Sequence, residues 1–331
     1  MSPSRRVFLQ QTSLLSASSV IFPLLSESAR DPLSSARPLR FGVIADVHKD
    51  VMHDADQRLA AFVERATEAK VGFIIQMGDF CVPKAANQGF MDIWRRWKGP
   101  NYHVIGNHDT DGGYSREQTV AYYDMPSRYY SFEEGDFHFV VLDGNDRPAD
   151  HVSGYPCYIN AEQQAWLKED LSATTRPTLV MVHQSLERPE DGGVQNGEAV
   201  RRILEEANQE AGFQKVLACF SGHHHRDYLR HIQGIAYSQI NSASYYWVGG
   251  DYQHVRYSKE VDAAHPWIKY TVPYRDSLFA IVSLDPARRK LTIEGKKSEM
   301  VGPAPWDLGK TREAWDAATL RAAISDRQVS M

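Results

Sequence analysis

Residues 40–48 have the sequence RFGVIADVH, in which an apolar run ends abruptly at a carboxylate. A short apolar run of this kind predicts a buried β-strand. The Asp46 carboxylate and the His48 imidazole follow this strand at once, and both groups can bind a metal ion. The chain shows the same arrangement, a strand followed by metal-binding side chains, several more times.

Strands and helices alternate after this first strand. Apolar residues recur at helical spacing within 56–70, which predicts a helix. Buried strands are expected at 71–77 and 102–105, with an amphipathic helix near 90–97 between them. This order gives a β-α-β-α-β run.

A second set of strands lies further along the chain. The expected elements are a hairpin of strands 129–132 and 138–142, a helix at 161–171, a strand at 178–182, a helix at 198–211, a strand at 216–220, and a closing hairpin of strands 278–284 and 291–294. Two sheets with helices outside them, an α/β sandwich, is the architecture that this order favours.

Metal-binding residue types fall at the ends of five of these strands. They are Asp46 and His48, then Asp79, then Asn107 with His108, then His183, and finally His223 and His225. Loops at neighbouring strand ends converge on one rim of an α/β sheet. We therefore expect these side chains to meet in one cleft.

Each of these fragments is weak evidence when taken alone. Asp46 and His48 could be solvated loop residues, and the three adjacent imidazoles of 223–225 could be a surface cluster with incidental metal affinity. His108 could be a buried, hydrogen-bonded histidine. The ordered combination at five strand ends is what makes a functional site the better interpretation.

The motifs resemble those of the calcineurin-like metallophosphoesterase superfamily, which run D-x-H, G-D, G-N-H-D/E, H and G-H-x-H. They occur here in order as Asp46-Val47-His48, Gly78-Asp79, Gly106-Asn107-His108-Asp109, His183 and Gly222-His223-His224-His225. The resemblance covers about residues 40–230. It implies a four-layer αββα sandwich that hydrolyses phosphate esters with a hydroxide held between two metal ions.

The resemblance also implies a role for each site residue. Asp46, His48, Asp79 and His225 would bind one metal, and Asp79, Asn107, His183 and His223 the other. His108, oriented by Asp109, would protonate or stabilise the leaving oxygen.

The chemistry of the donor groups agrees with a two-metal site. A carboxylate has two oxygens, so Asp79 can bridge two cations about 3.5 to 4 Å apart. Mixed imidazole and oxygen donors suit Fe, Mn or Zn, and leave the choice among them open. Val82 stands where the purple acid phosphatases of this superfamily have a tyrosine ligand, which argues against a purple iron site.

The substrate is less clear from the sequence. A phosphomonoesterase is the favoured activity; a phosphodiesterase, including one for cyclic nucleotides, and a non-catalytic metal-binding relative are the alternatives. The aromatic-rich segment 241–274 could cover the cleft and stack on a flat group, or it could simply pack on the sandwich. Arg188 and Arg226 could neutralise a further phosphate oxygen.

Charge argues against a long nucleic acid as partner. The chain carries a formal net charge of −5, and removing the net +2 of residues 1–38 leaves −7 on the remainder. A polyanion would therefore meet no general attraction. We expect a small phosphate ester as the partner. The three cysteines, Cys81, Cys157 and Cys219, are too few for a disulfide framework and are expected to be buried apolar residues.

The N-terminus resembles a twin-arginine export signal. Arg5 and Arg6 precede Phe8, Leu9 and an apolar, serine-rich stretch that is too short to span a bilayer comfortably. We expect residues 1–38 to be signal and linker, and the protein to be periplasmic or extracellular, with membrane contact only through that signal. We expect residues 39–300 to form the metallophosphoesterase domain and residues 301–331 to form a helical tail.

Overall fold

The computed structural model describes residues 31–309 and 315–331, so most of the predicted export signal lies outside the described residues. The first sheet has the strand order β14-β13-β12-β1-β2-β3. These strands are β1 (Leu39–Ile44), β2 (Phe73–Gln76), β3 (Asn101–His103), β12 (Ala280–Asp285), β13 (Lys290–Glu294) and β14 (Arg327–Ser330). Strands β1 to β3 are parallel, and β12 to β14 complete the sheet in antiparallel pairs.

The second sheet has the order β4-β5-β6-β7-β9-β8. Its strands are β4 (Tyr130–Glu134), β5 (Phe137–Leu142), β6 (Thr178–Val182), β7 (Val216–Ser221), β8 (Leu229–Ile232) and β9 (Ile235–Gln239). Strands β5, β6, β7 and β9 are parallel, while β4 and β8 form antiparallel edges. A separate two-stranded ribbon joins β10 (Tyr245–Trp247) to β11 (Thr271–Pro273).

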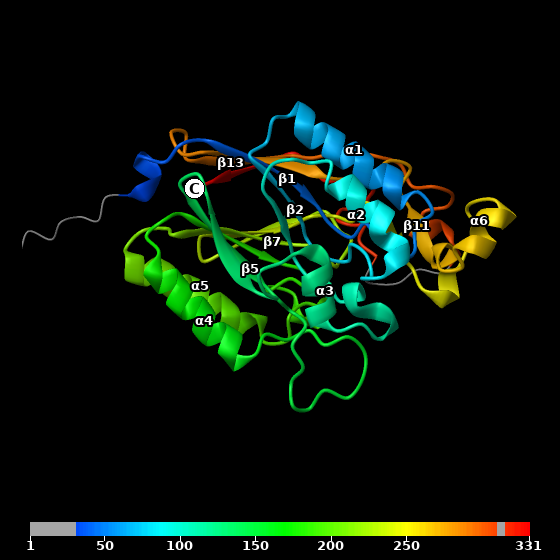
Figure 1. Cartoon of the computed structure of the whole chain (residues 1–331), viewed down its shortest axis with the longest axis horizontal. Coiled ribbons are helices and arrows are strands. Elements are labelled where there is room, and N and C mark those ends of the chain that lie inside the picture. Colours follow the sequence, from blue (N-terminus) through cyan, green and yellow to red (C-terminus); the bar gives the residue numbers. More distant parts are fainter. Residues whose placement is uncertain (1–30, 310–314) are drawn as a thin grey trace, which may run out of the picture.

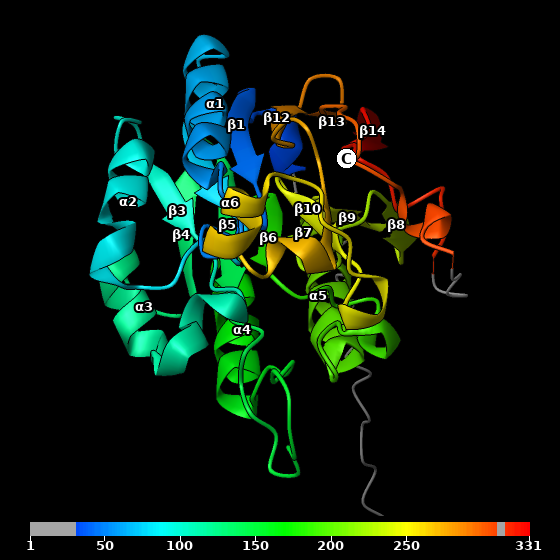
Figure 2. The ribbon, with the colours of Figure 1, turned by 90° about the vertical axis from the view of Figure 1, so that its right-hand side faces the viewer.

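Helices cover the outer faces of the two sheets. Helices α1 (Ala55–Glu68) and α2 (Gln88–Trp94) lie on the first sheet, and α4 (Ala161–Ala173) and α5 (Gly197–Ala211) lie on the second (Figures 1 and 2). The shorter helices are α3 (Arg116–Tyr123) and α6 (Lys259–Ala264). The predicted four-layer αββα sandwich is confirmed.

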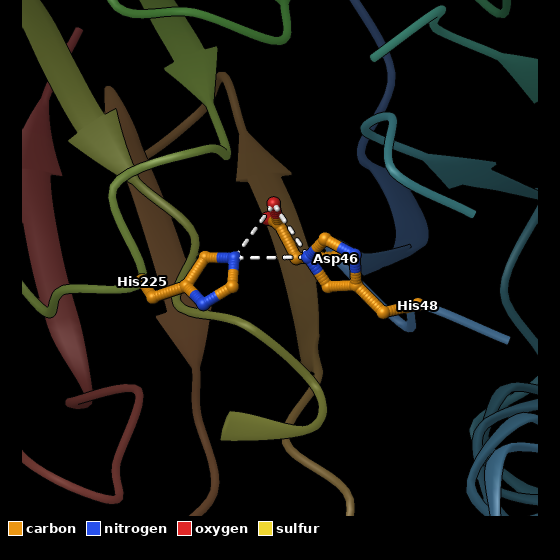
Figure 3. Close-up of side chains that lie close together, drawn as sticks. All are labelled: Asp46, His48 and His225. Atoms are coloured by element: carbon orange, nitrogen blue, oxygen red, sulfur yellow. Dashed lines mark hydrogen bonds and ion pairs between the residues drawn. The ribbon is translucent and has the colours of Figure 1, made fainter. Parts of the chain in front are cut away.

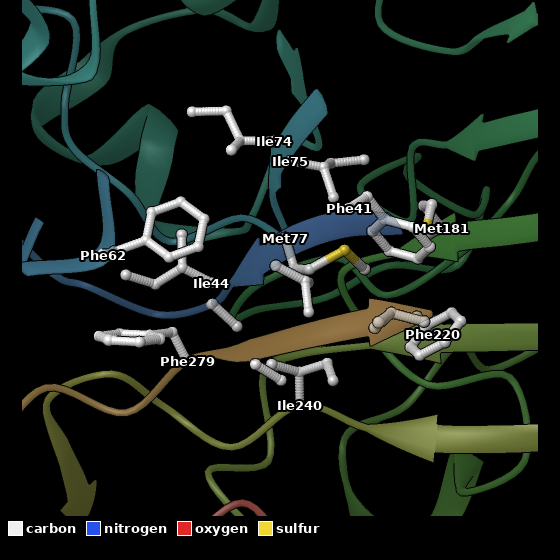
Figure 4. Packing of buried hydrophobic residues seen from close by; sticks show 14 of the residues in the cluster. Phe41, Ile44, Phe62, Ile74, Ile75, Met77, Met181, Phe220, Ile240 and Phe279 are labelled. Atoms are coloured by element: carbon white, nitrogen blue, oxygen red, sulfur yellow. The ribbon is translucent and has the colours of Figure 1, made fainter. Parts of the chain in front are cut away.

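The main core lies between the two sheets. The Phe41 ring of β1 packs edge-on against Phe139 of β5 and Phe220 of β7, with ring centroids 5.7 and 6.1 Å apart. Figure 4 shows Phe41, Met181 and Phe220 gathered between strands of both sheets. Burial of each such side chain stabilises the fold by about 1.5 to 3 kcal/mol. This apolar layer fixes where the strands end, and so fixes the rim from which the site residues project.

The prediction of a helical C-terminal tail is wrong for the part of 301–331 that the structure describes. This part contains a 3-10 turn at Pro305–Asp307 and ends in β14, which pairs with β13 at the edge of the first sheet. Leu320 and Ile324 are buried, as a docked tail requires, but they lie in irregular backbone.

Two further findings concern the cysteines and the membrane. All three cysteines are free; Cys81 and Cys219 are buried as expected, whereas Cys157 is only partly buried. In the described ranges, the helices all fall short of the length and apolar character that crossing a membrane requires.

Candidate metal centre

The predicted metal ligands converge at one rim of the sandwich. Asp46, His48 and His225 form one group, whose ligand atoms all lie within 4.8 Å of one another (Figure 3). The Nε2 atoms of His48 and His225 are 3.1 Å apart, and the His225 Nε2 is 3.2 Å from an Asp46 carboxylate oxygen. Three side chains from the first strand end and from the loop after β7 thus aim at one point.

A second group lies beside the first. It consists of Asp79, His183 and His223, again with ligand atoms within 4.8 Å of one another. The His183 Nε2 is 3.2 Å from an Asp79 carboxylate oxygen and 3.2 Å from the Asn107 side-chain oxygen. Asn107, expected as the amide ligand, therefore lies where the sequence placed it.

Asp79 lies between the two groups. The same oxygen, Oδ2, is 3.2 Å from the His183 Nε2 and 3.8 Å from the His48 Nε2. Its other oxygen, Oδ1, accepts a hydrogen bond from the His108 backbone N–H at 2.8 Å. This placement fits a carboxylate shared by two cations.

Backbone strain marks the same residues independently. Among the described residues, nine non-glycine positions have positive φ, and five of them are predicted ligands: Asp46, His48, Asp79, His223 and His225, with φ between 51° and 75°. Only a few per cent of non-glycine residues adopt this conformation. Such strain gathers where function requires it, so the clustering supports a site rather than a set of solvated loops.

The imidazoles are prepared for metal binding. Burial lowers the pKa of His48 well below its usual range, and burial together with the His183 charge lowers the pKa of His223 to about 3. Both rings are therefore neutral at physiological pH, as a ligand must be. The His183 Nδ1–H donates to the Met77 carbonyl at 2.8 Å, which leaves Nε2 for a cation.

Burial and the neighbouring Asp79 carboxylate shift the pKa of His183 in opposite directions. Burial lowers the pKa of His183, but the Asp79 carboxylate outweighs burial and raises that pKa to about 9. A cation bound at Asp79 would compete with this proton for the Nε2 lone pair. The residues present therefore fit a pair of metal ions, in both donor chemistry and position.

His224, the middle residue of the cluster 223–225, has a different role. The His224 Nε2 hydrogen bonds with the Ser185 hydroxyl at 2.7 Å, and the ring packs away from the two ligand groups.

Asp109 does not orient His108, and this part of the prediction is wrong. Its carboxylate accepts hydrogen bonds from the backbone N–H groups of Asp79, Phe80, Cys81 and Gly106 at 2.7 to 3.1 Å. It also accepts from the Tyr123 hydroxyl at 2.9 Å. Asp109 thus ties together two loops that carry ligands.

The partner of His108 is Asp111, which the sequence analysis missed. The His108 Nδ1 is 2.7 Å from the Asp111 Oδ2. Burial lowers the pKa of His108, but the Asp79 and Asp111 charges outweigh burial and raise that pKa to about 9. Bound cations would oppose the effect of Asp79. The three-residue spacing was the available signal, because residues i and i+3 align in a 3-10 turn such as the one that begins at His108.

The cleft around these residues has two arms, which share His48, Asp79 and His108. The Trp267 arm has a volume of about 290 Å³ and is also lined by Val51, Phe80, Val82, Lys84, Tyr114 and Trp267. The Arg226 arm has a volume of about 260 Å³ and is also lined by Asp191, His224, Arg226, Tyr245, Tyr246 and Trp247. The two arms therefore meet at the residues that would bind the metals.

Several aromatic residues of 241–274 lie in this cleft, as one of the two interpretations of that segment expected. Tyr245 is buried and stacks on the His48 ring, with centroids 4.8 Å apart. Trp247 and Trp267 are 45% and 56% exposed, at the two arms. Arg226 lines an arm and lies 3.9 Å from an Asp191 carboxylate oxygen, to which Arg188 is paired at 2.7 Å.

Comparison with known proteins agrees with this geometry. The family model described as calcineurin-like phosphoesterase matches residues 39–227, and the chain belongs to this family. It is a metal-dependent hydrolase of phosphate esters.

One curated relative and two solved structures are informative. A manganese-dependent ADP-ribose/CDP-alcohol diphosphatase from Arabidopsis thaliana is 33% identical over 149 residues, which cover 37% of this chain and 46% of the relative. The chain thus spans about half of that relative's length. A dimetal phosphatase from Danio rerio has a TM-score of 0.54 at 16% identity, with 80% of this chain and 98% of that chain covered. GAP50, the anchor in the inner membrane complex of Plasmodium, has a TM-score of 0.50 at 16% identity, with 87% and 89% covered. Both structures share the fold.

Proposed function

We propose that the protein hydrolyses small substrates in which organic groups flank the reacting phosphate on both sides, as in diphosphate-bridged nucleotides. The observation that carries this proposal is the shape of the cleft, whose Trp267 and Arg226 arms meet at His48, Asp79 and His108. A phosphomonoester, the activity favoured from the sequence, has one organic group and would fill one arm. A substrate with two groups uses both.

The lining of the arms supports the same substrate class. Trp267 offers an exposed aromatic surface on which a nucleobase can stack. Arg226 lies in the other arm, where its guanidinium can hold a second phosphate. The name of the Arabidopsis relative, an ADP-ribose/CDP-alcohol diphosphatase, describes compounds of this kind.

Different side chains of the centre would bind the metals and donate the proton. When bound, two metal ions supply charge stabilisation for the phosphoryl group and an activated water. Asp46, Asp79 and the histidine ligands would hold that pair in place. His108 would donate a proton to the leaving oxygen as its bond to phosphorus breaks.

Of Fe, Mn and Zn, the relative's name favours Mn, and elemental analysis of the purified protein tests this.

A substrate panel tests the proposal. ADP-ribose, a CDP-alcohol, cyclic AMP, bis-p-nitrophenyl phosphate and p-nitrophenyl phosphate would be compared by kcat/KM after loading with each metal. We expect a diphosphate-bridged compound to exceed p-nitrophenyl phosphate by at least about 100-fold, since two occupied arms add roughly 3 kcal/mol of binding. Preference for the monoester would refute the proposal and restore the prediction made from the sequence.

Variants of the Trp267 arm test the stacking. Trp267→Ala should raise KM for nucleotide substrates about 5- to 30-fold, because an aromatic–base contact contributes about 1 to 2 kcal/mol. Trp306→Ala is the matched control, since Trp306 is also exposed but is not among the lining residues of either arm. Equal effects of the two substitutions would contradict a role for Trp267.

We also propose that the protein is exported by the twin-arginine route. The support is the order of Arg5, Arg6 and the apolar stretch that follows them. Replacing both arginines with lysine should retain the protein in the cytoplasm, as measured by cell fractionation. Export that is unchanged in this variant would contradict the proposal.

A further inference from the structure

A tyrosine from a distant loop contacts His108, the proton donor proposed above. The Tyr155 hydroxyl donates to the Asp111 Oδ1 at 2.7 Å and lies 3.1 Å from the His108 Nδ1. The Asp111 Oδ2 is 2.7 Å from the same His108 nitrogen. Each oxygen of Asp111 therefore has its own partner, and the three side chains form a closed triangle.

This triangle settles which ring nitrogen of His108 faces the substrate. Nδ1 is directed to Asp111, so its proton is held there, and Nε2 is the nitrogen left for the cleft. His108 lines both arms. Within 31–309 and 315–331, no protein group hydrogen bonds with the His108 Nε2.

Packing alone does not account for the position of Tyr155. Its side chain is 46% exposed, and Val152 in the same loop is 95% exposed, so burial does not fix the tip of this loop. Tyr155 is held by the polar contacts of its hydroxyl with Asp111 and His108 and by an edge-on contact with the His108 ring, with ring centroids 4.7 Å apart. Tyr155 is exposed, yet its hydroxyl donates to a carboxylate beside the cleft. This contact points to a function.

The base of the loop is anchored firmly. Asp143 and Asp146 each accept a hydrogen bond from Arg116 and another from Arg128, at 2.7 to 3.0 Å. Arg116 begins α3, the helix that directly follows the segment carrying His108 and Asp111. The loop and its target are thus tied to the same element, which fixes the distance over which Tyr155 must reach.

We propose that Asp111 and Tyr155 are positioning residues that set the orientation and the tautomer of His108 for proton donation to the leaving group. As the P–O bond breaks, its electron pair stays on the leaving oxygen, which takes the proton from Nε2; solvent then returns a proton to the ring. This inference rests on the role proposed above for His108, and it is independent of which phosphate ester is the natural substrate.

Leaving-group dependence separates positioning from structure. Tyr155→Phe keeps the ring and removes only the hydroxyl, so it should lower kcat about 5- to 10-fold for an ester with a poor alcohol leaving group. Turnover of p-nitrophenyl esters, which need no acid, should change less than about twofold, and KM should not change. Asp111→Asn should show the same selectivity with a loss of about 10- to 100-fold.

Controls distinguish the possible failures. Val152→Ala, in the same exposed loop, should behave as the wild-type protein, and metal content should be equal in all variants. His108→Ala sets the maximum selectivity; if it lowers turnover equally for good and poor leaving groups, His108 is not the acid and the inference fails with it. If His108→Ala is selective but Tyr155→Phe and Asp111→Asn are not, only the positioning role is refuted. Should Asp111→Asn fold poorly, Tyr155→Phe decides the question.

Discussion

Replacement of Asp227 by Asn should detach the C-terminal segment 315–331 from the body of the protein. The Asp227 carboxylate is fully buried and accepts hydrogen bonds from the side chains of Arg321, Arg327 and Ser325, at 2.6 to 2.8 Å, and from the Ser325 backbone N–H at 3.1 Å. Asparagine has nearly the same shape, but it lacks the charge and one acceptor oxygen. Two guanidinium groups would then compete for one amide oxygen.

The size of the effect follows from these contacts. Loss of one partner of a buried ion pair costs about 3 to 5 kcal/mol. The Arg321 side chain is 46% exposed, so water would replace part of what it loses. A cost of about 2 to 3 kcal/mol in the free energy of unfolding remains. For a domain of this size that corresponds to a fall in Tm of about 3 to 5 °C.

Thermal unfolding followed by circular dichroism measures this loss, and limited proteolysis shows whether 315–331 is cleaved first. Asp285→Asn is the control, because among the described residues Asp285 forms an ion pair with the exposed Arg288 alone, and its replacement should cost less than about 1 kcal/mol. Burial raises the pKa of Asp227, but its hydrogen bonds to Ser325 and Arg327 outweigh burial and lower the pKa. Its contribution is therefore present above about pH 4 and is lost as pH falls through the folded-state pKa, where the two proteins should become equally stable. A variant that melts within 1 °C of the wild type at pH 7 would refute this reasoning.

Three further predictions concern the site and the second sheet. Gly106→Ala should abolish most activity and metal binding, because a Cβ there would lie 2.2 Å from the backbone nitrogen and a carboxylate oxygen of Asp79; normal metal content by elemental analysis would contradict it. Removal of metal with a chelator should abolish hydrolysis and lower the Tm, since a ligand that binds only the folded state stabilises it; an unchanged Tm would indicate that the centre does not bind metal tightly. Burial lowers the pKa of His138, but Asp170 and Glu133, each 2.8 Å from a ring nitrogen, raise it overall. The stability that this group adds is complete below about pH 6.5 and is lost as pH rises through the raised pKa, so His138→Gln should destabilise more at pH 6 than at pH 9 in urea unfolding.

The strands that carry the ligands could be predicted because they are continuous apolar runs. Strands β2, β6 and β7 are buried throughout, and β1 is buried from Phe41 to Ile44, which favours apolar residues at most positions. Strands β8 and β14 were missed because they lie at sheet edges and are only partly buried, so their sequences show no such run. The short ribbon of β10 and β11 gives too few residues for any periodicity.

The tail was misassigned for a related reason. Leu320 and Ile324 are four residues apart, a spacing that suggested one face of a helix. Both are buried, but a turn and irregular backbone bring them inward, and their partner surface comes from residues far away in sequence. The helix propensity of the tail residues cannot predict these contacts with distant parts of the chain.

The metal ligands were accessible to sequence reasoning, whereas the groups that orient His108 were only partly so. Ligands are tied to strand ends, and strand ends can be located. The resemblance implied Asp109 as the partner of His108, yet here its carboxylate is bound by backbone N–H groups of the neighbouring loops. Asp111 could have been inferred from the turn, but Tyr155 could not, because its contact spans 44 residues and depends on a loop conformation.

The late position of the C-terminal segment 315–331 in the sequence has a consequence for biosynthesis. Thr319 accepts hydrogen bonds from the Arg226 side chain at 3.2 Å and from the Asp227 backbone N–H at 2.8 Å, so a residue translated after every predicted ligand contacts the arginine of the Arg226 arm. A nascent chain that has reached β13 already contains every predicted metal ligand. The predicted ligands can therefore come together before residues 315–331 dock, and the contact of Thr319 with Arg226 forms only after those residues have left the ribosome.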